Sequence, residues 1–309
     1  MIEVSGLTRY YGHHAAVLDV SFTIDDNRVV GFLGLNGAGK STTLKILAGL
    51  LLPSSGSVSI DGVDVVEAPD SLRAQIGFLP EDAPLYQDMR VREFVVYCGR
   101  LKGMSAEEAE GAVDEVLARC DLTPRAEHVI GTLSHGYRKR VGIAQAIIHS
   151  PKLVILDEPI SGLDPVQIRE IRRVIVGLKS HCTVLISSHI LSEISQTCDR
   201  ILVLKDGRLV AHATEDELSA RLSGGGRLLL EVRGDTDGVL AALRSFPGCT
   251  SAELQRVEGD VVHAEVHLGT DEREALVAHV VGAGFGLRRL DDAEGELEEI
   301  FLNLMESTA

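Results

Sequence analysis

The chain has 309 residues, a length typical of about two domains, and 45% of them are hydrophobic, enough to bury a substantial core. Aromatic residues make up only 4%, Trp is absent and the formal net charge is −16. These values argue against stacking on single-stranded nucleic acid and against a large footprint on a phosphate backbone, so we expect no nucleic-acid partner.

Cysteine usage and apolar run lengths indicate the cellular setting. No CxxC pair occurs, which favours reduced thiols in a cytoplasmic protein over a disulfide framework or a zinc site. The cysteines are Cys98, Cys120, Cys182, Cys198 and Cys249. The opening residues MIEVSGLTRYYG do not resemble a signal peptide. No apolar run approaches the ~20 residues that span a bilayer, so any action at a membrane would require a partner.

Short apolar runs alternate with longer periodic stretches through the first two thirds of the chain. The runs predict buried strands of a parallel sheet at Val29–Leu33, Leu153–Leu156, Thr183–Ser187 and Ile201–Leu204. The periodic stretches predict helices at Arg90–Leu101, Ser105–Cys120 and Pro165–Lys179. This alternation favours an α/β fold built of layers.

A domain boundary is predicted near residue 222. Thr214 and Glu217 have the spacing of a capping box, which predicts a short helix over Glu215–Leu222. The residues Ser223–Gly226 read SGGG, a typical flexible linker. We therefore divide the chain into a first domain of residues 1–222, a linker of residues 223–226 and a second domain of residues 227–309.

The second domain has a different pattern. RLLLEVRG predicts a strand, DTDGVLAALRSF a helix, SAELQRVEGDVVHAEVHLG two strands joined by a turn, DEREALVAHVVGAG a helix, FGLRRL a strand and ELEEIFLNLM a closing helix. The order βαββαβ is that of a small α+β, ferredoxin-like sandwich. Its 7 basic and 17 acidic residues give a net charge of −10, so this domain carries most of the acidity of the chain.

The segment GLNGAGKST, Gly34 to Thr42, follows the first predicted strand of the sheet. It matches the phosphate-binding pattern G-x-x-x-x-G-K-[ST], and an apolar helix follows it. The glycines let backbone N–H groups close around a phosphate, Lys40 supplies a positive charge and Ser41 offers a hydroxyl to Mg²⁺.

The segment LVILDEP, Leu153 to Pro159, is a buried strand that ends in two carboxylates. Asp157 is placed to hold Mg²⁺, directly or through water. Glu158 can orient and activate a water as a general base. The pattern is weak alone but specific when paired with the phosphate-binding loop.

The segment LSHGYRKR predicts a helix that begins after Ser134 as N-cap. Gly136 and the cations Arg138, Lys139 and Arg140 fall in its first turns, where the helix dipole disfavours positive charge. Either the cations form a solvated face, or an anion binds at this helix N-terminus.

The segment HAEVH predicts a strand whose alternate residues His263, Glu265 and His267 share one face. Two interpretations are open. The three side chains bind a transition metal, or they form the solvent face of a half-buried strand.

These motifs together resemble the ATP-binding subunit of an ABC transporter, over roughly residues 1–220. LSHGY resembles the ABC signature usually written LSGGQ, SGLD the D-loop, ISSH the switch histidine and YYG the A-loop. IGFLPEDAPLYQDMRVREF and the stretch from LSHGY to LDEPISGLDP are similar to ATPases of ABC-2-type exporters, including drug-resistance and gliding-motility types. That branch also carries a small C-terminal domain ending in an EEIF-like helix, as at Glu298–Phe301.

The resemblance implies the fold and a role for each matching residue. The first domain would be a P-loop NTPase with a RecA-like core, a helical subdomain and an N-terminal β-subdomain. Tyr11 would stack on adenine, and His189 would contact the γ-phosphate and hold the attacking water. The residues that would bind ATP are Tyr11, Asn36, Gly37, Ala38, Gly39, Lys40, Ser41 and Thr42. The catalytic residues would be Lys40, Glu158 and His189. The Mg²⁺ ligands would be Ser41, Asp157 and Glu81.

In this family the signature caps ATP held by the opposite subunit. Ser134, His135, Gly136 and Tyr137 would therefore act on a second chain, with Gly136 letting the backbone approach the phosphate and Ser134 donating a hydrogen bond. Asp164 of the D-loop would report across the interface. The resemblance thus implies a head-to-tail homodimer or a pairing with a different ATPase subunit.

The sequence departs from the family pattern at two places. Glu81 stands where the Q-loop has glutamine, so it is either a metal ligand or a residue of the coupling loop. In the signature, His135 and Tyr137 replace the first glycine and the glutamine, which changes the rim of that site.

The leading hypothesis is an ATPase that powers transport, with export favoured, through a separate multi-span permease at the inner face of the cell membrane. The groove for the permease would be lined partly by the segment 81–92. A soluble ABC ATPase acting on nucleic acid or ribosomes is the alternative, and a non-hydrolysing interaction protein is a third. The acidity and the single ATPase unit count against the soluble ATPase. The intact catalytic residues count against the non-hydrolysing protein.

Overall fold

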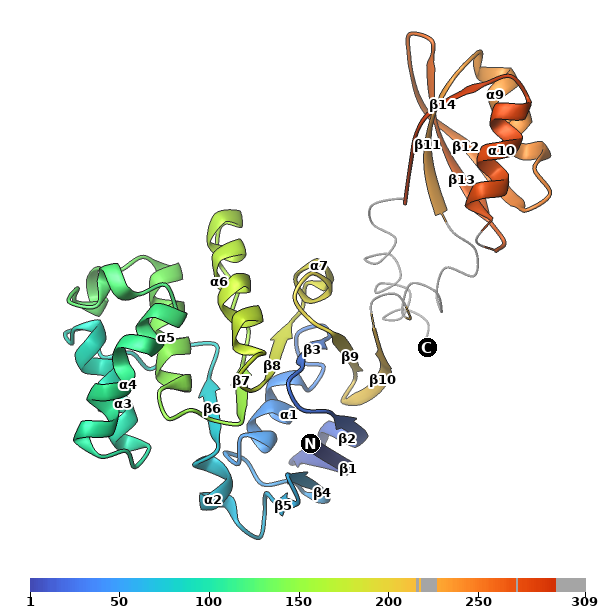
Figure 1. Cartoon of the computed structure of the whole chain (residues 1–309). Coiled ribbons are helices and arrows are strands. Elements are labelled where there is room, and N and C mark those ends of the chain that lie inside the picture. The colour runs from blue at the N-terminus through green and yellow to red at the C-terminus, as the bar shows by residue number, and fades with distance from the viewer. Residues whose placement is uncertain (215–216, 218–226, 271, 293–309) are drawn as a thin grey trace. The chain divides into compact units, whose positions relative to one another are not determined.

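The computed structural model describes residues 1–214, 217, 227–270 and 272–292. The chain forms two compact units, Met1–Glu215 and Asp216–Ala309 (Figure 1). The predicted helix 215–222, the linker 223–226 and the closing helix with its EEIF segment lie outside the described residues, except for Glu217.

The first unit contains two sheets. An antiparallel sheet has the strand order β2-β1-β4-β5, and a six-stranded sheet has the order β10-β9-β3-β8-β7-β6. In the larger sheet all neighbouring strands are parallel except β10, which pairs antiparallel with β9. The strands are β1 (Ile2–Tyr11), β2 (His14–Ile24), β3 (Val29–Leu33), β4 (Ser55–Ile60), β5 (Val63–Asp64), β6 (Ile76–Leu79), β7 (Leu153–Leu156), β8 (Thr183–Ser188), β9 (Arg200–Lys205) and β10 (Arg208–Ala213).

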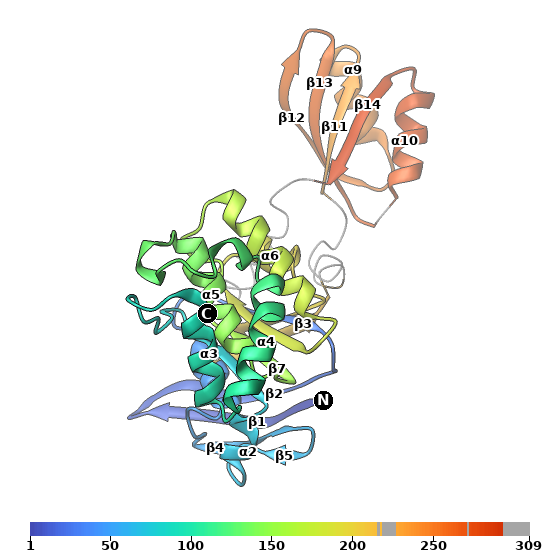
Figure 2. The same ribbon diagram turned by 60° about the vertical axis from the view of Figure 1, so that its left-hand side comes forward.

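Helices surround the parallel strands. They are α1 (Lys40–Leu47), α2 (Pro69–Arg73), α3 (Val91–Leu101), α4 (Ala106–Arg119), α5 (His135–Ile147), α6 (Pro165–Leu178) and α7 (Leu191–Ser195). Helices α3, α4 and α5 pack on one another beside β6 (Figures 1 and 2). The predicted strands and helices of this unit are confirmed to within one residue at each end. Within the described part of the chain, none of the helices has the length and apolarity required to cross a bilayer.

One hydrophobic core fills the space between the two sheets around α1. All five residues of β3 are buried, as expected for a strand covered on both faces, whereas burial alternates along much of β2. Phe22 of β2 meets Phe32 of β3 edge to face, with ring centroids 5.6 Å apart. Leu44 and Leu47 of α1 are fully buried in the same core. The segment between β3 and α1 is therefore fixed at both ends by tight packing.

The second unit has the predicted βαββαβ order and forms an antiparallel sheet, β12-β13-β11-β14. Its elements are β11 (Arg227–Arg233), α9 (Thr236–Ser245), β12 (Cys249–Glu258), β13 (Val261–Leu268), α10 (Arg273–Gly282) and β14 (Gly286–Asp292). Helices α9 and α10 cover one face of the sheet (Figure 2). Their apolar residues pack against those of β11 and β13 to form a separate core, so the ferredoxin-like prediction is confirmed.

The HAEVH segment lies on β13, in the interior of this sheet. Its valine and alanine residues face the core, and His263, Glu265 and His267 lie on the opposite face. Glu265 is only 6% exposed, accepts a hydrogen bond from Gln255 Nε2 at 2.7 Å and lies 3.1 Å from His267 Nε2. No three His, Cys, Asp or Glu side chains among the described residues are arranged to hold a metal, so the metal interpretation is wrong there. The solvent-face interpretation fits His267 but not Glu265.

His149, just beyond the end of α5, contacts the parallel sheet through its ring Nε2, 3.2 Å from the carbonyl of Ile76. Burial, helped by the nearby charge of Lys102, lowers the pKa of His149 to about 4. The unfolded chain therefore takes up a proton near the ordinary histidine pKa, while the folded chain takes it up only near pH 4. Stability is consequently lost as the pH falls through this window.

We predict that His149→Gln, which keeps a donor for Ile76 but cannot titrate, makes the protein less sensitive to acid. When the pH falls from about 7.5 to about 5, the free energy of unfolding should fall by about 1 kcal/mol less in the variant than in the wild type. This figure allows for the partial exposure of the ring. Urea unfolding followed by circular dichroism at the two pH values measures it. Equal acid sensitivity of the two proteins would contradict the prediction.

Candidate nucleotide site

The loop between β3 and α1 presents backbone N–H groups at the start of a helix. Gly39 is the N-cap of α1, with φ +101°, and no side chain caps the first turn. A Cβ at Gly39 would lie 2.4 Å from the carbonyl oxygen of Ala16, so this position requires glycine. The positive end of α1 is thus available to an anion.

Lys40 projects from the first residue of α1 into the same region and is only 5% exposed. Its Nζ donates a hydrogen bond to the carbonyl of Gly34 at 2.6 Å and lies 3.6 Å from Glu158 Oε1. Burial lowers the pKa of Lys40, and the charge of Glu158 opposes that shift. These contacts hold the ammonium group of Lys40 close to the phosphate-binding loop.

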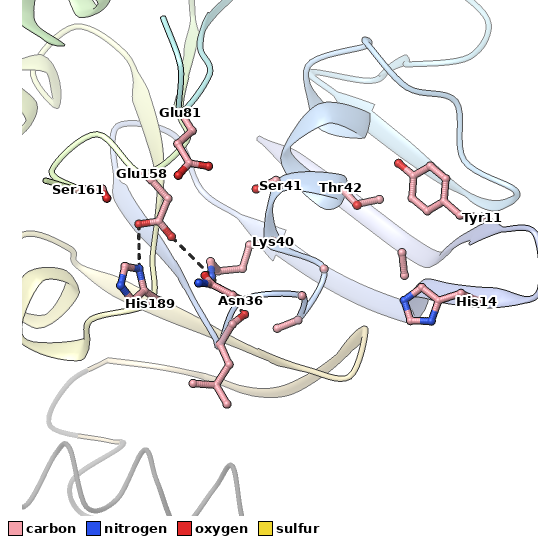
Figure 3. Close-up of a pocket in the computed structure, with 15 residues that line it drawn as sticks. Tyr11, His14, Asn36, Lys40, Ser41, Thr42, Glu81, Glu158, Ser161 and His189 are labelled. Atoms are coloured by element: carbon pink, nitrogen blue, oxygen red, sulfur yellow. Dashed lines mark hydrogen bonds and ion pairs between the residues drawn. The ribbon is translucent and has the colours of Figure 1, made fainter.

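Glu158 follows β7 and is 7% exposed. Its Oε2 lies 3.2 Å from His189 Nδ1, and its Oε1 faces Lys40 (Figure 3). Burial raises the pKa of Glu158, while Lys40 and His189 act in the opposite direction. The carboxylate is therefore held between two basic groups, with its basicity raised above that of an exposed glutamate.

Asp157 is 3% exposed and accepts two hydroxyl hydrogen bonds on Oδ1. Ser41 Oγ donates at 3.1 Å and Ser187 Oγ at 2.6 Å. Ser187 also accepts from the backbone N–H of Glu158 at 2.8 Å, so one serine orients both acidic residues. The sequence analysis gave Ser187 no role of its own within the ISSH segment. Its position near the end of a predicted strand could have indicated that it lies beside the acidic pair.

A cavity of about 420 Å³ extends from these residues towards β1 and β2. Tyr11 and His14 lie at one end, and Glu158 and His189 at the other (Figure 3). The described residues that line it are Tyr11, His14, Ala16, Leu35, Asn36, Gly37, Ala38, Gly39, Lys40, Ser41, Thr42, Glu81, Glu158, Ser161 and His189. His14 was missed by sequence reasoning.

Arg9 contacts the ring of Tyr11. The guanidinium carbon of Arg9 lies 5.1 Å from the ring centroid, a cation–π arrangement. Tyr11 is 47% exposed and lines the cavity, whereas Tyr10 is not among its described lining residues. The cavity therefore has an aromatic surface at one end and paired charges at the other.

The signature residues lie apart from this cavity. Ser134 is the N-cap of α5, as predicted, and accepts from the N–H of Tyr137 at 3.5 Å. His135 is exposed, with Nδ1 3.4 Å from the carbonyl of Gly162. Among the described residues that line the cavity, none comes from the segment 134–137. A single chain does not bring its signature to its own phosphate-binding loop.

Packing explains two further residues at this helix. A Cβ at Gly136 would lie 2.7 Å from Gln167 Oε1, so the space beside Gly136 is filled by a side chain of α6. The guanidinium carbons of Arg125 and Arg140 lie 5.3 and 5.0 Å from the centroid of the Tyr137 ring. The Gln167 side chain would have to shift to admit a larger residue at position 136.

Asp164 is the N-cap of α6, and its Oδ1 accepts from the N–H groups of Val166 and Gln167 at 2.9 Å. Its carboxylate is thus placed at the start of a helix, where negative charge is favoured. Ser161, earlier in the same SGLD segment, lines the cavity.

The basic residues after the signature do not form the solvated face considered above. Lys139 is 5% and Arg140 4% exposed. Arg140 forms an ion pair with Glu170, and Arg138 donates to the carbonyl of Leu133 at 2.8 Å. The solvated-face interpretation is therefore wrong for Lys139 and Arg140, because each is buried with partners inside the unit.

The donor set of the site fits a magnesium ion that also contacts phosphate. Ser41 and Asp157 place a hydroxyl and a carboxylate oxygen 3.1 Å apart, and Glu81 lies beside Glu158 at the cavity wall (Figure 3). Mg²⁺ is commonly held by one or two carboxylates together with substrate phosphates.

The known proteins that are similar to this chain are ATP-binding proteins of ABC transporters. The family model described as ABC transporter matches residues 17–161. The chain is 31% identical to the linearmycin resistance ATP-binding protein LnrL of Bacillus subtilis, over 98% of both proteins. It is 32% identical to the bacitracin transport ATP-binding protein BcrA of Bacillus licheniformis, over 99% of this chain and 97% of BcrA. A solved dimeric cassette, MJ0796, matches 69% of this chain and 98% of its own with a TM-score of 0.63 and 29% identity.

A phosphate-binding loop on a parallel sheet, with an acidic strand end and a histidine beside it, defines a P-loop ATPase. The chain belongs to the family of ABC transporter ATP-binding proteins. It is an ATP-binding and ATP-hydrolysing subunit that powers transport, and the alternative of a soluble ATPase acting on nucleic acid or ribosomes is not supported.

We predict that Ser187→Ala lowers kcat for ATP hydrolysis about tenfold or more, because the backbone N–H of Glu158 loses its acceptor and Asp157 loses a donor. The matched control is Ser188→Ala, since the Ser188 hydroxyl donates to Glu193 and accepts from the N–H of Ile190 in the following turn. Steady-state kinetics and thermal unfolding of both variants test this. An equal loss of kcat in the two variants at equal stability would contradict it.

Proposed function

We propose that Glu158 activates the attacking water, that His189 contacts the γ-phosphate and holds that water, and that Lys40 neutralises the phosphates. The observation that supports this most strongly is the Glu158 carboxylate held between Lys40 and His189 at one end of the cavity. A glutamate with a raised pKa is suited to accept a proton from water at neutral pH. The residues Asn36–Thr42 bind the phosphates, and Tyr11 stacks on adenine.

Magnesium is the second part of the proposal. Ser41 and Asp157 hold the ion, and Glu81 acts either as a further ligand or within the coupling loop. Bound there, the ion neutralises charge that develops on the phosphates. Ser187 keeps Asp157 oriented for this task through its 2.6 Å hydrogen bond.

The complete site requires two chains. We propose that Ser134, His135, Gly136 and Tyr137 of one subunit close over ATP held at residues 34–42 of another, with Asp164 at the interface. Two features support this: the signature does not line the cavity of its own chain in the described residues, and a similar cassette is a dimer. A homodimer and a pairing with a different ATPase subunit are both compatible with it.

We predict that Glu158→Gln lowers ATP hydrolysis by about 100-fold or more but leaves ATP binding intact, so that an ATP-bound dimer accumulates. Lys40→Ala serves as the control, since it removes a phosphate contact and should prevent both nucleotide binding and dimer formation. Light scattering with and without ATP measures the mass. A strictly monomeric Glu158→Gln protein at high concentration would contradict the two-chain site.

The transport partner is proposed to be a separate multi-span permease, which places this chain at the inner face of the cell membrane. Relatives named for linearmycin resistance and bacitracin transport support export as the direction. The second unit, within the proposed boundaries 227–309 after a linker at 223–226, is an accessory domain. The first domain spans residues 1–222.

An exposed aromatic cluster supports the proposed permease contact near residues 81–92. Tyr86 is 52% and Tyr97 37% exposed, with ring centroids 5.6 Å apart, and Tyr86 also packs edge to face on Phe94. Exposed aromatic side chains held by neighbouring rings are suited to receive a helix of another protein. We propose that a cytoplasmic helix of the permease docks here.

We predict that Tyr86→Ala weakens co-purification with the permease by about tenfold while ATP hydrolysis by the isolated chain is unchanged. A multi-span membrane protein encoded beside this chain would be the candidate permease for this experiment. Tyr10→Ala is the matched control, because Tyr10 is similarly exposed but lies on β1. Undiminished recovery with Tyr86→Ala would place the permease contact elsewhere.

A further inference from the structure

Lys139 connects three parts of the first unit. It lies on α5, shortly after the signature, and is only 5% exposed. Its Nζ donates to the carbonyl of Glu81 at 2.7 Å and to the carbonyl of Glu158 at 3.2 Å. One ammonium group therefore joins the signature helix, the loop after β6 and the residue that follows Asp157.

The backbone of Glu158 needs such support. Its φ is +48°, in the left-handed region that is strained for a residue with a side chain. The next residue is Pro159, which further restricts the conformation of the residue before it. Strained residues of this kind cost about 1–3 kcal/mol and persist where their surroundings hold them.

Hydrogen bonds hold Glu158 on both sides. Its N–H donates to Ser187 Oγ at 2.8 Å, and its carbonyl accepts from Lys139. With both backbone polar groups fixed, the side chain is directed towards Lys40 and His189. Loss of the Lys139 contact would weaken one half of this clamp, because the carbonyl would keep its longer hydrogen bond from the N–H of Ser161, at 3.4 Å, and lose the shorter one.

Charge provides a second reason for a cation at this position. Burial lowers the pKa of Lys139, and the negative charges of Glu81, Asp82, Glu158 and Asp157 oppose that shift. Glu81 adds a carboxylate to the wall of the cavity. Lys139 Nζ, 2.7 Å from the Glu81 carbonyl, supplies a positive charge close to that carboxylate.

We propose that Lys139 is a positioning residue for ATP hydrolysis: it fixes the left-handed backbone of Glu158, offsets the charge of Glu81 and so links the loop after β6 to the water-activating carboxylate. This inference rests on the role proposed above for Glu158. Lys139 is not among the described residues that line the cavity, and it acts through Glu158.

Lys102 is a control for a merely stabilising lysine. It also donates to two backbone carbonyls, those of Arg73 and Ile76, at 3.1 and 2.9 Å, but does so away from the cavity. Methionine replaces either lysine with a side chain of similar length and no charge. A loss of general stability should therefore appear in both variants, and a loss of positioning only in Lys139→Met.

The first test compares steady-state ATP hydrolysis by the full-length wild type, Lys139→Met and Lys102→Met. We expect Lys139→Met to lower kcat about tenfold or more with less than about threefold change in KM, since the phosphate-binding loop is untouched. Unchanged kcat, or an equal loss in Lys102→Met, would overturn the proposal.

The second test uses Glu81. Adding Glu81→Gln to Lys139→Met removes the carboxylate that Lys139 offsets, so kcat should recover by about threefold or more relative to Lys139→Met alone. No recovery would overturn the charge-offset part of the proposal. The loss of ATP hydrolysis in Glu158→Gln tests the proposed role of Glu158 separately. A failure of that role can therefore be distinguished from a failure of the proposal for Lys139.

A crystal structure of Lys139→Met gives a readout that does not depend on turnover. The proposal expects residue 158 to leave its left-handed conformation or its carboxylate to move from Lys40, with a shift of the loop at Glu81. An unchanged Glu158 backbone and an unchanged contact with Lys40 would overturn it, whatever the kinetics of the wild type.

Discussion

The contact between Lys40 and Glu158 is the constraint on which the first unit depends. The two side chains lie 3.6 Å apart and each is less than a tenth exposed. Removing two charges from water costs several kcal/mol per ion in proteins, and close approach of the pair recovers that cost only with good geometry and further hydrogen bonds. Such a pair contributes little to stability by itself. The two side chains therefore stay close together only if a rigid part of the fold holds them there.

The parallel sheet supplies that frame. Strands β3, β8 and β7 are neighbours, so their carboxyl ends meet at one edge and bring together the phosphate-binding loop, the Ser187–His189 segment and the acidic pair. The core around α1 holds the loop, and Ser187 links Asp157 to the backbone of Glu158. Each charged group reaches its partner because an element of the core ends at that point.

Much of this could be predicted from the sequence because its determinants are local. Burial periodicity located the strands and helices, and the spacing of GLNGAGKST and LVILDEP located the loop and the acidic pair. The burial of Lys139 could not be predicted, since its acceptors Glu81 and Glu158 are distant in sequence and the helix dipole argument treats a cation as exposed. The contact of Gly136 with Gln167 could not be predicted either, because Gln167 belongs to a helix that sequence spacing does not place beside α5.

The most direct test of the account is a crystal structure of the full chain with Mg²⁺ and a non-hydrolysable ATP analogue. The central claim is that Lys40, Ser41, Glu158 and His189 form one nucleotide site. The account predicts the γ-phosphate within about 3 Å of Lys40 Nζ, with adenine against Tyr11 and a water between Glu158 and the γ-phosphate. A nucleotide bound away from the loop at residues 34–42, or a γ-phosphate out of reach of both Lys40 and Glu158, would contradict it.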